Sequence, residues 1–241
     1  MIEAVIMRHL SGRNTLCVSS QAGCPMACTF CATGKLGLIR NLTYAEIIDQ
    51  IMWAVHHLAR EDRKLRNIVY MGMGEPLLNY AEVSKSIHIA CGQKKLDLSN
   101  RRITVSTCGI APRIIDFARD FPQVSLAISL HAPNDEARKK IMPVENTYPL
   151  DVLFSAIDEY VAITNKRIFY EYIMINGITD RLEYATELGE GTDSNGYLPT
   201  SKIMIKKFQD TLDRYGIPST VRHTMGDDID AACGQLALKE E

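Results

Sequence analysis

The stretch Thr15-Leu-Cys-Val-Ser-Ser-Gln-Ala-Gly-Cys-Pro-Met-Ala-Cys-Thr-Phe-Cys31 decides how the rest of the chain is interpreted. Its first part, Thr15–Ser20, is rich in residues that favour a β-strand, and a loop follows it. This loop holds three cysteines in the pattern C-x-x-x-C-x-x-C, namely Cys24, Cys28 and Cys31. Three thiolates at this spacing can occupy three corners of a cubane iron–sulfur cluster and leave one iron open to an external ligand.

Zinc is the alternative occupant of the cysteine loop, with Cys17 or a distant histidine as the fourth ligand. Structural zinc sites usually pair two knuckles of closely spaced cysteines or histidines, however, and no second pair follows here. The chain has seven cysteines, and an odd number in a reducing compartment argues against a framework of disulfides. The pattern therefore favours a cluster bound by Cys24, Cys28 and Cys31.

Outward from the cysteine loop, the sequence alternates between β-rich runs and amphipathic runs. Thr43 with Glu46 three residues later is typical of a capping box at the start of a helix. Strands that alternate with helices pair in parallel through right-handed crossovers, so the pattern predicts an α/β fold with an open sheet or a barrel. The further expected strands are 67–72, 103–107, 124–130, 168–175 and 219–223, and the expected helices are 43–58, 80–91, 112–119, 150–164, 181–189 and 201–215.

The composition is that of one globular domain, and we expect it in the cytoplasm. The chain has 241 residues, 46% of them hydrophobic, and its 27 basic and 29 acidic residues give a net charge of −2. No apolar stretch approaches the roughly 20 residues that a membrane span needs, and the N-terminus lacks a secretory signal. The charge balance gives no general sign of a polyanionic partner. Local basic clusters, among them Arg138-Lys-Lys140, are interpreted as solvated surface, with contact to a phosphate backbone as the alternative.

Further strings of sequence carry a resemblance to a known family. A three-cysteine loop after the first strand of a βα chain resembles the radical S-adenosylmethionine (SAM) superfamily, which implies a partial (βα)6-type barrel with mostly parallel strands. Other strings together resemble the RlmN/Cfr family of RNA adenine methyltransferases: Cys17-Val-Ser-Ser-Gln21, Arg40-Asn-Leu42, Met71-Gly-Met-Gly-Glu-Pro76, Ala127-Ile-Ser-Leu-His-Ala-Pro-Asn-Asp135 and Gly226-Asp-Asp-Ile-Asp-Ala-Ala-Cys-Gly-Gln-Leu236. Pro76 is closer to the RlmN branch, which methylates adenine C2, than to the Cfr branch, which methylates C8.

The resemblance implies a [4Fe-4S] cluster held by the three loop cysteines, with the amino and carboxylate groups of SAM on the open iron. Phe30 would pack against the adenine of SAM, and Gly74 with Glu75 would meet its ammonium group. The carboxyl ends of parallel strands gather at one edge, where α/β folds bind ligands. The residues expected to complete the SAM site at this edge are Ser106, Ser129, Leu130 and His131.

The resemblance also implies a route for methyl transfer to RNA. Cys233 would accept a methyl group from one SAM to give S-methylcysteine, and a second SAM would supply the radical that removes hydrogen from this methyl group. The resulting carbon radical would add to C2 of an adenosine in 23S rRNA, in tRNA or in both. Cys17 would resolve the protein–RNA crosslink by proton removal and a disulfide with Cys233, and Glu3 is a further candidate base. We also expect that an electron donor such as flavodoxin serves the protein and that the chain is a monomer.

Two departures from the family pattern lead to an alternative interpretation. Only about 14 residues precede the first expected strand, so we expect residues 1–241 to form a single core domain without the family's N-terminal accessory domain. A strand of the family, with the asparagine that contacts SAM, is expected to be missing near residues 189–191, where this chain is short and polar. Such a chain would bind a cluster but methylate RNA poorly. The alternatives are a degenerate or incomplete cluster-binding protein that interacts with RNA without turnover, and, less favoured, a radical SAM enzyme acting on a small molecule.

Overall fold

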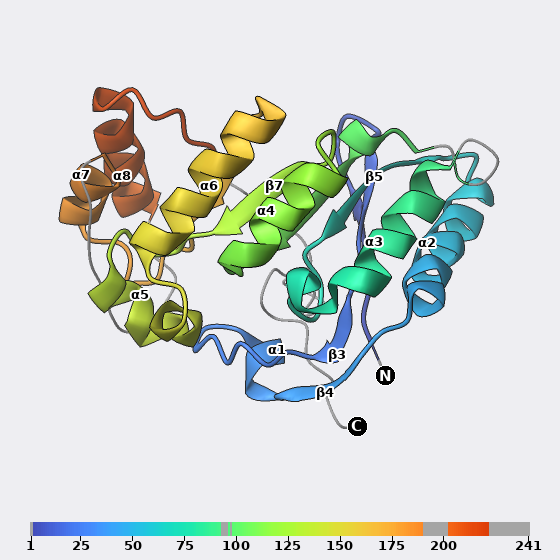
Figure 1. The fold of residues 1–241 in the computed structure, drawn as a ribbon. Helices are drawn as coiled ribbons and strands as arrows, with labels where there is room; N and C mark the ends of the chain where they lie inside the picture. The colour runs from blue at the N-terminus through green and yellow to red at the C-terminus, as the bar shows by residue number, and fades with distance from the viewer. Residues whose placement is uncertain (1, 93–95, 97, 190–201, 222–241) are drawn as a thin grey trace.

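The central sheet has six strands in the described part of the chain, and all but the first run parallel. The computed structural model describes residues 2–92, 96, 98–189 and 202–221 (Figure 1). The strand order is β1-β2-β5-β6-β7-β8, with β1 antiparallel to β2. This confirms the predicted α/β fold with a mostly parallel sheet. The strands are β1 Val5–Arg8, β2 Asn14–Cys17, β5 Leu65–Tyr70, β6 Ile103–Thr107, β7 Ser125–Ser129 and β8 Phe169–Glu171.

The crossover helices lie side by side across one face of the sheet (Figure 1). Their apolar residues recur at helical spacing, as Ile47, Ile51 and Leu58 do on the buried face of α2. The capping box is confirmed, because the Thr43 side chain accepts the Glu46 N–H and the Glu46 carboxylate accepts the Thr43 N–H. Within the residues described, no helix combines the length and the apolar character of a membrane span. The helices are α2 Tyr44–Ala59, α3 Tyr80–Cys91, α4 Ala111–Asp120 and α6 Leu150–Thr164.

Several expected elements are confirmed and others are corrected. The strand 103–107 and the helices 80–91 and 150–164 have the expected bounds. The expected strand 168–175 is shorter, because β8 ends at Glu171. Among the described residues, β8 is last in the strand order and pairs with β7 alone, so a single neighbour supports it. The expected strand 219–223 is wrong for residues 219–221, which have no regular structure, whereas residues 222 and 223 lie outside the described part.

The cysteine loop belongs to a small second sheet that the sequence predicts only as loop. Its two strands pair antiparallel, and a short helix begins directly after Cys31. Gly23 is required in this hairpin, because its φ is +77° and a Cβ there would lie 1.9 Å from the Gly37 carbonyl oxygen. The hairpin lies at the end of the molecule where α5 is also found (Figure 1). These elements are β3 Gln21–Gly23, α1 Ala32–Lys35, β4 Leu38–Asn41 and α5 Asp135–Ile141.

Two C-terminal helices form a smaller apolar cluster. Tyr184 and Ala185 of α7 pack with Phe208 and Leu212 of α8. The helices span Leu182–Gly189 (α7) and Lys202–Arg214 (α8), close to the expected 181–189 and 201–215. A strand of the family is expected to be missing near residues 189–191. Residues 190 and 191 lie outside the described part of the chain, so this expectation stays a prediction.

Candidate active site at the carboxyl edge of the sheet

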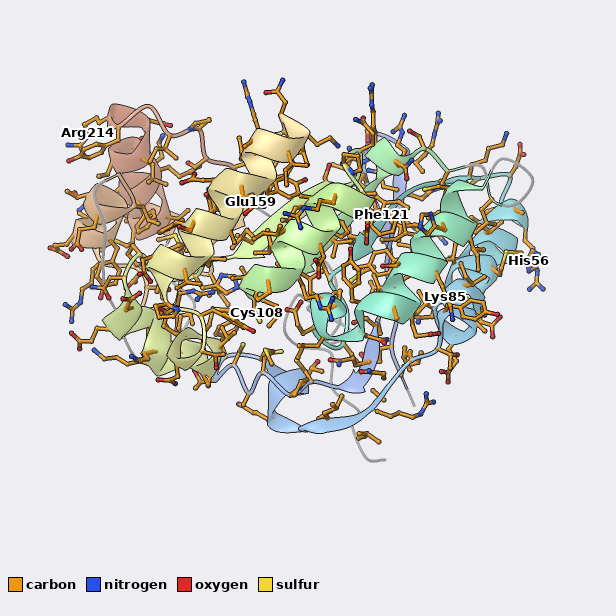
Figure 2. The ribbon with its side chains drawn as sticks, viewed as in Figure 1. His56, Lys85, Cys108, Phe121, Glu159 and Arg214 are labelled. Carbon is orange, nitrogen blue, oxygen red and sulfur yellow. The ribbon has the colours of Figure 1, made fainter. Side chains whose placement is uncertain are left out.

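Side chains from three neighbouring strands meet where β6, β7 and β8 end. The Ser106 hydroxyl donates a hydrogen bond to the Glu171 carboxylate at 2.9 Å and lies 3.5 Å from the Ser129 hydroxyl. Figure 2 shows Cys108, just after β6, on the side of the molecule that carries the cysteine loop, whereas Phe121 lies at the other end of α4. The structure therefore brings Ser106 and Ser129 together at the ligand-binding edge of the sheet.

Glu171 is a residue of this edge that the sequence analysis missed. Its carboxylate accepts the Ser106 hydroxyl, and its carbonyl oxygen accepts the N–H groups of Leu130 and His131 at 3.1 and 3.2 Å. The sequence contains one signal that could have identified it. Glu171 is the single charged residue in the apolar run Ile168–Ile175, and a charge in a strand needs polar partners nearby. Glu171 thus joins the ends of β6, β7 and β8.

His131 follows β7 in the left-handed backbone region, with φ at +60°. Its Nδ1 accepts the N–H of Ile173 at 3.2 Å, which leaves the ring proton on Nε2. Burial, with a smaller contribution from Arg138, lowers the His131 pKa to about 3, so the ring is neutral at neutral pH. Phe30 of the cysteine loop meets this ring edge-on, with 5.0 Å between the centroids. Two predicted SAM contacts, far apart in sequence, are therefore adjacent.

The three loop cysteines are grouped closely enough to influence one another's ionisation. Burial raises the pKa of Cys24 and of Cys28 to about 12, and the neighbouring thiols and Glu75 add to the increase. Among the residues that the structure describes, no three His, Cys, Asp or Glu side chains are arranged to hold a single metal ion. A four-iron cluster binds each thiolate to a different iron, so it fits thiols that are grouped without converging on one point.

Backbone hydrogen bonds fix the cysteine loop. The Thr29 N–H donates to the Ile141 carbonyl, and the Cys24 N–H donates to the Gly37 carbonyl, both at 2.9 Å. Ile141 ends α5, so the middle of the cysteine motif is tied to the helix that follows β7. The positions of the thiols are thus set by the main chain rather than by flexible side chains.

Gly74 and Glu75 are both held in place by their neighbours. Gly74 has a φ of +100°, and a Cβ there would lie 2.5 Å from the Cβ of Gln21. The Glu75 carboxylate is 3% exposed and accepts the N–H groups of Leu77 and Cys108 at 2.9 and 2.8 Å. Burial raises the pKa of this carboxyl group. Glu75 therefore fastens the turn after β5 to the end of β6, and its contact with a ligand ammonium group stays a prediction.

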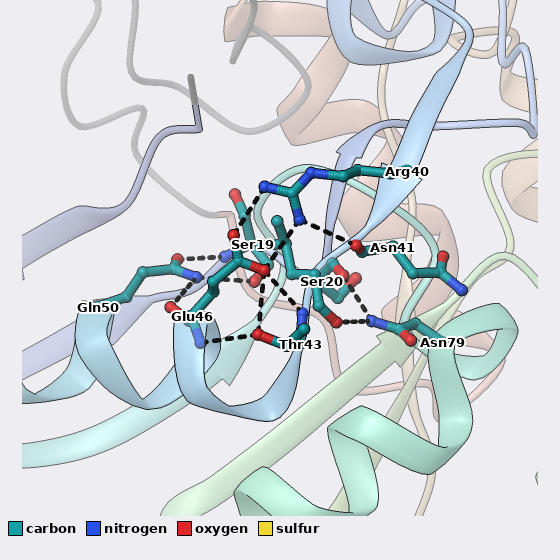
Figure 3. Close-up of polar contacts among 9 residues, drawn as sticks. Ser19, Ser20, Arg40, Asn41, Thr43, Glu46, Gln50 and Asn79 are labelled. Carbon is teal, nitrogen blue, oxygen red and sulfur yellow. Dashed lines mark hydrogen bonds and ion pairs between the residues drawn. The ribbon is translucent and has the colours of Figure 1, made fainter.

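Two of the strings that carry the family resemblance meet in one polar network, drawn in Figure 3. The Ser19 N–H donates to the side-chain oxygen of Gln50 at 2.9 Å, and the Gln50 amide donates to the Ser19 carbonyl at 3.1 Å. Arg40 donates to both oxygens of the Glu46 carboxylate, at 2.7 and 2.9 Å. The network holds the backbone that leads into the cysteine loop and the strand that leaves it.

Asn79 is buried at one side of this network, and its loss is expected to be costly. Its side-chain amide donates to the carbonyls of Ser20 and Leu42, each at 2.8 Å (Figure 3). We expect Asn79→Ala to lower the free energy of unfolding of the apo protein by about 2 kcal/mol, because two buried carbonyls lose a donor. Chemical denaturation measures the change, with Leu78→Ala at the exposed neighbouring position as the control. Equal stabilities of the two variants would show that the network does not hold the loop.

The candidate methyl-transfer residues lie partly outside the described chain. Cys17 ends β2, is 7% exposed and faces Val5 of β1 in the strand register. The same pairing brings Glu3 beside the cysteine segment, because the Ser19 hydroxyl donates to the Glu3 carbonyl at 2.6 Å; burial raises the pKa of the Glu3 carboxyl group. Cys233 lies outside the described residues, and no disulfide joins any two of the cysteines that are described. The roles of all three residues stay predictions.

Comparison with known proteins agrees with this geometry. Residues 18–188 match the model of the Radical SAM superfamily. A probable dual-specificity RNA methyltransferase RlmN of Thermus thermophilus is 43% identical over 255 residues, covering 98% of this chain and 71% of that protein. Its namesake from Enterococcus faecalis is 42% identical over 260 residues, covering 100% and 72%. The crystal structure of a radical SAM methyltransferase from Sphaerobacter thermophilus has a TM-score of 0.93 at 41% identity, covering 98% of this chain and 73% of that one.

A mostly parallel α/β sheet with a three-cysteine loop at its carboxyl edge defines the class of radical SAM proteins, and the superfamily match places the chain in it. Identities above 40% over nearly the whole chain show, in addition, to which family of this superfamily the chain belongs. The chain belongs to the RlmN family. This confirms the resemblance that the cysteine loop and the sequence strings indicate. Membership brings SAM and a [4Fe-4S] cluster as the cofactors.

Proposed function

We propose that the chain is a radical SAM RNA methyltransferase that methylates C2 of an adenosine in 23S rRNA and in tRNA. The observation that carries the proposal is the convergence of the cysteine loop with the strand ends. Phe30 of the loop contacts His131 after β7, and Thr29 of the loop is bonded to the end of α5. A cluster on the loop would therefore lie beside the polar strand ends, the edge at which α/β folds bind their ligands. The RNA substrate follows from the names of the relatives.

Cys24, Cys28 and Cys31 would hold the [4Fe-4S] cluster. The donor set fits, because three thiols on one rigid loop leave the fourth iron without a protein ligand. Bound there, the cluster supplies the electron that cleaves SAM. The raised pKa values of Cys24 and Cys28 mean that both thiols must lose a proton when iron binds.

The strand ends would bind and orient SAM. Ser106 and Glu171 present a hydroxyl and a carboxylate, which are suitable partners for the ribose hydroxyls. His131 is neutral, so it does not repel the positive sulfonium and ammonium groups, and its Nε2–H remains a donor. Phe30, adjacent to His131, offers an aromatic surface for the adenine. Gly74 would let the ammonium group approach the backbone, and Leu130 would pack beside the ligand.

Cys233 and Cys17 would carry the methyl transfer. The Cys233 thiolate takes a methyl group from SAM, which leaves as S-adenosylhomocysteine, and the thioether then becomes the source of the new carbon on adenine. Cys17 resolves the bond between protein and RNA, with Glu3 as a candidate base. What supports this assignment is the presence of both cysteines, which a protein that only binds a cluster would not need.

A cluster-binding protein without turnover is the second candidate. The alignment with the Enterococcus faecalis relative extends over 260 residues whereas this chain has 241, so that relative has residues without a counterpart here. The length difference supports the expectation of a missing segment, which the sequence pattern places near residues 189–191 and which would weaken methylation. In either case we propose a monomer that takes electrons from a one-electron donor such as flavodoxin.

One experiment distinguishes the two candidates. The reconstituted protein is incubated without oxygen with SAM, dithionite and either 23S rRNA or tRNA, and the adenosines are analysed by mass spectrometry. We expect 2-methyladenosine, in rRNA and in tRNA. Methylation at C8 would contradict the assigned position. A reconstituted protein that holds the cluster but yields no methylated RNA would favour the protein without turnover, and a protein that cannot be loaded with an iron–sulfur cluster would contradict both candidates.

A further inference from the structure

Arg138 is buried, although the sequence places it in a basic cluster. The interpretation of Arg138-Lys-Lys140 as solvated surface is wrong for its first member, whose side chain is 0% exposed, whereas Lys139 and Lys140 are exposed. The reason is its place on the buried face of α5 between Ala137 and Ile141. Burying a guanidinium is costly unless its N–H groups are bonded, so its partners explain why it is there.

The guanidinium binds the backbone at the ends of two strands. Its Nε donates to the carbonyl of Leu130 at 3.1 Å. Its Nη2 donates to the carbonyls of Cys108 and Ser129 at 2.5 and 3.3 Å. Cys108 follows β6, while Ser129 and Leu130 lie at the end of β7. The planar arginine side chain thus holds three carbonyls in one rigid arrangement, which a lysine cannot do.

A buried carboxylate holds the guanidinium from the other side. Nη1 of Arg138 donates to Glu145, whose side chain is also 0% exposed. Glu145 accepts the N–H of Leu150 at 3.0 Å, which fixes it to the start of α6. Burial, followed by a hydrogen bond with Asp135, raises the Glu145 pKa to about 7. The orientation of Arg138 is therefore set on one side by the ends of β6 and β7 and on the other side by Glu145, which is itself bonded to the start of α6.

The same helix reaches the cysteine loop. Thr29, next to Cys28, donates to the carbonyl of Ile141 at the end of α5. Helix α5 therefore connects the cysteine loop, through Ile141, with the ends of β6 and β7, through Arg138.

We infer that Arg138 is a positioning residue for SAM binding. By holding the carbonyls of Cys108, Ser129 and Leu130, it fixes the two strand ends that present Ser106 and His131 to the ligand. The inference rests on the proposed function, because it takes SAM as the ligand of this edge. Arg138 acts through the backbone and needs no contact with SAM.

Two variants separate positioning from folding. Arg138→Lys keeps a charge beside Glu145 but lacks the fork that reaches three carbonyls. The double variant Arg138→Met with Glu145→Gln removes both charges, so no buried carboxylate is left without its partner. The glutamine can still accept the N–H of Leu150. Lys139→Met, at the exposed neighbouring position of α5, is the matched control.

Binding of SAM to the reconstituted variants is measured together with iron content and Tm. We expect both variants to hold as much iron as the unsubstituted protein and to melt at a somewhat lower temperature, because three buried carbonyls lose their donor, while the Kd for SAM rises about 10- to 100-fold. In SAM cleavage with dithionite, KM for SAM should rise with little change in kcat. Hydrogen exchange of the apo protein gives a readout that needs no cofactor, and the amides of Cys108, Leu130 and His131 should exchange faster.

The outcomes distinguish the inference from the proposed function. Unchanged SAM affinity in both variants, with unchanged exchange at these amides, would overturn the inference and leave Arg138 as the charge partner of Glu145. The inference would also be overturned if Lys139→Met weakened SAM binding as much as the two Arg138 variants do. Failure of the unsubstituted, cluster-loaded protein to bind SAM would overturn the proposed function itself.

Discussion

Replacing any one of Cys24, Cys28 and Cys31 with alanine is expected to remove the iron–sulfur cluster and to abolish cleavage of SAM. Each thiol would bind a different iron, so two cysteines cannot hold the cluster that three hold. Iron in the reconstituted protein should fall from about four atoms per chain to near zero. Metal analysis, the visible absorbance and the yield of 5′-deoxyadenosine measure the effect.

Cys91→Ala is the matched control for this experiment. Cys91 is half-buried at the end of α3 and lines a cavity with His88 and Phe121 at the opposite end of the helix layer from the cysteine loop. Its alanine variant should keep the full iron content and SAM cleavage. Stoichiometric zinc without iron–sulfur absorbance in the unsubstituted protein would instead support the zinc alternative.

Replacing Cys233 and Cys17 is expected to stop methylation at two different stages. Cys233→Ala removes the thiol that accepts the first methyl group, so neither a methylated peptide nor methylated RNA should form. Cys17→Ala should leave the methyl group on Cys233 and trap a covalent protein–RNA complex, because Cys17 acts after the carbon–carbon bond has formed. Peptide mapping detects the methyl group, and a denaturing gel detects the complex.

The melting temperature controls for damage to the fold in these variants. Cys17 is buried in β2, so its truncation leaves a small cavity and is expected to cost about 1 kcal/mol of stability. A variant that melts normally and still yields free methylated RNA at the usual rate would contradict the role of Cys17. Methylation of RNA by the Cys233→Ala variant at the usual yield would contradict the S-methylcysteine route.

Much of the fold can be predicted from the sequence, because the signals are local. The bounds of α3, α6 and β6 follow from apolar periodicity, and the start of α2 follows from the cap formed by Thr43 and Glu46. The hairpin of β3 and β4 is missed, because four exposed residues in β4 carry no alternation of apolar and polar side chains. The length of β8 is also missed, because the end of a strand depends on the strands that pair with it, and in the described part of the chain β8 pairs with β7 alone.

The sequence by itself determined the class of this protein: the spacing of Cys24, Cys28 and Cys31 after a strand is a local pattern, and so is the strand–helix alternation around it. Only the tertiary structure decided which polar residues serve the site. Glu171 and Arg138 look like ordinary charges in sequence, yet one bonds to Ser106 and the other lies fully buried against three strand-end carbonyls. The physical reason is that a buried charge is stable only with its partners, and these partners come from strands and helices far apart in the chain.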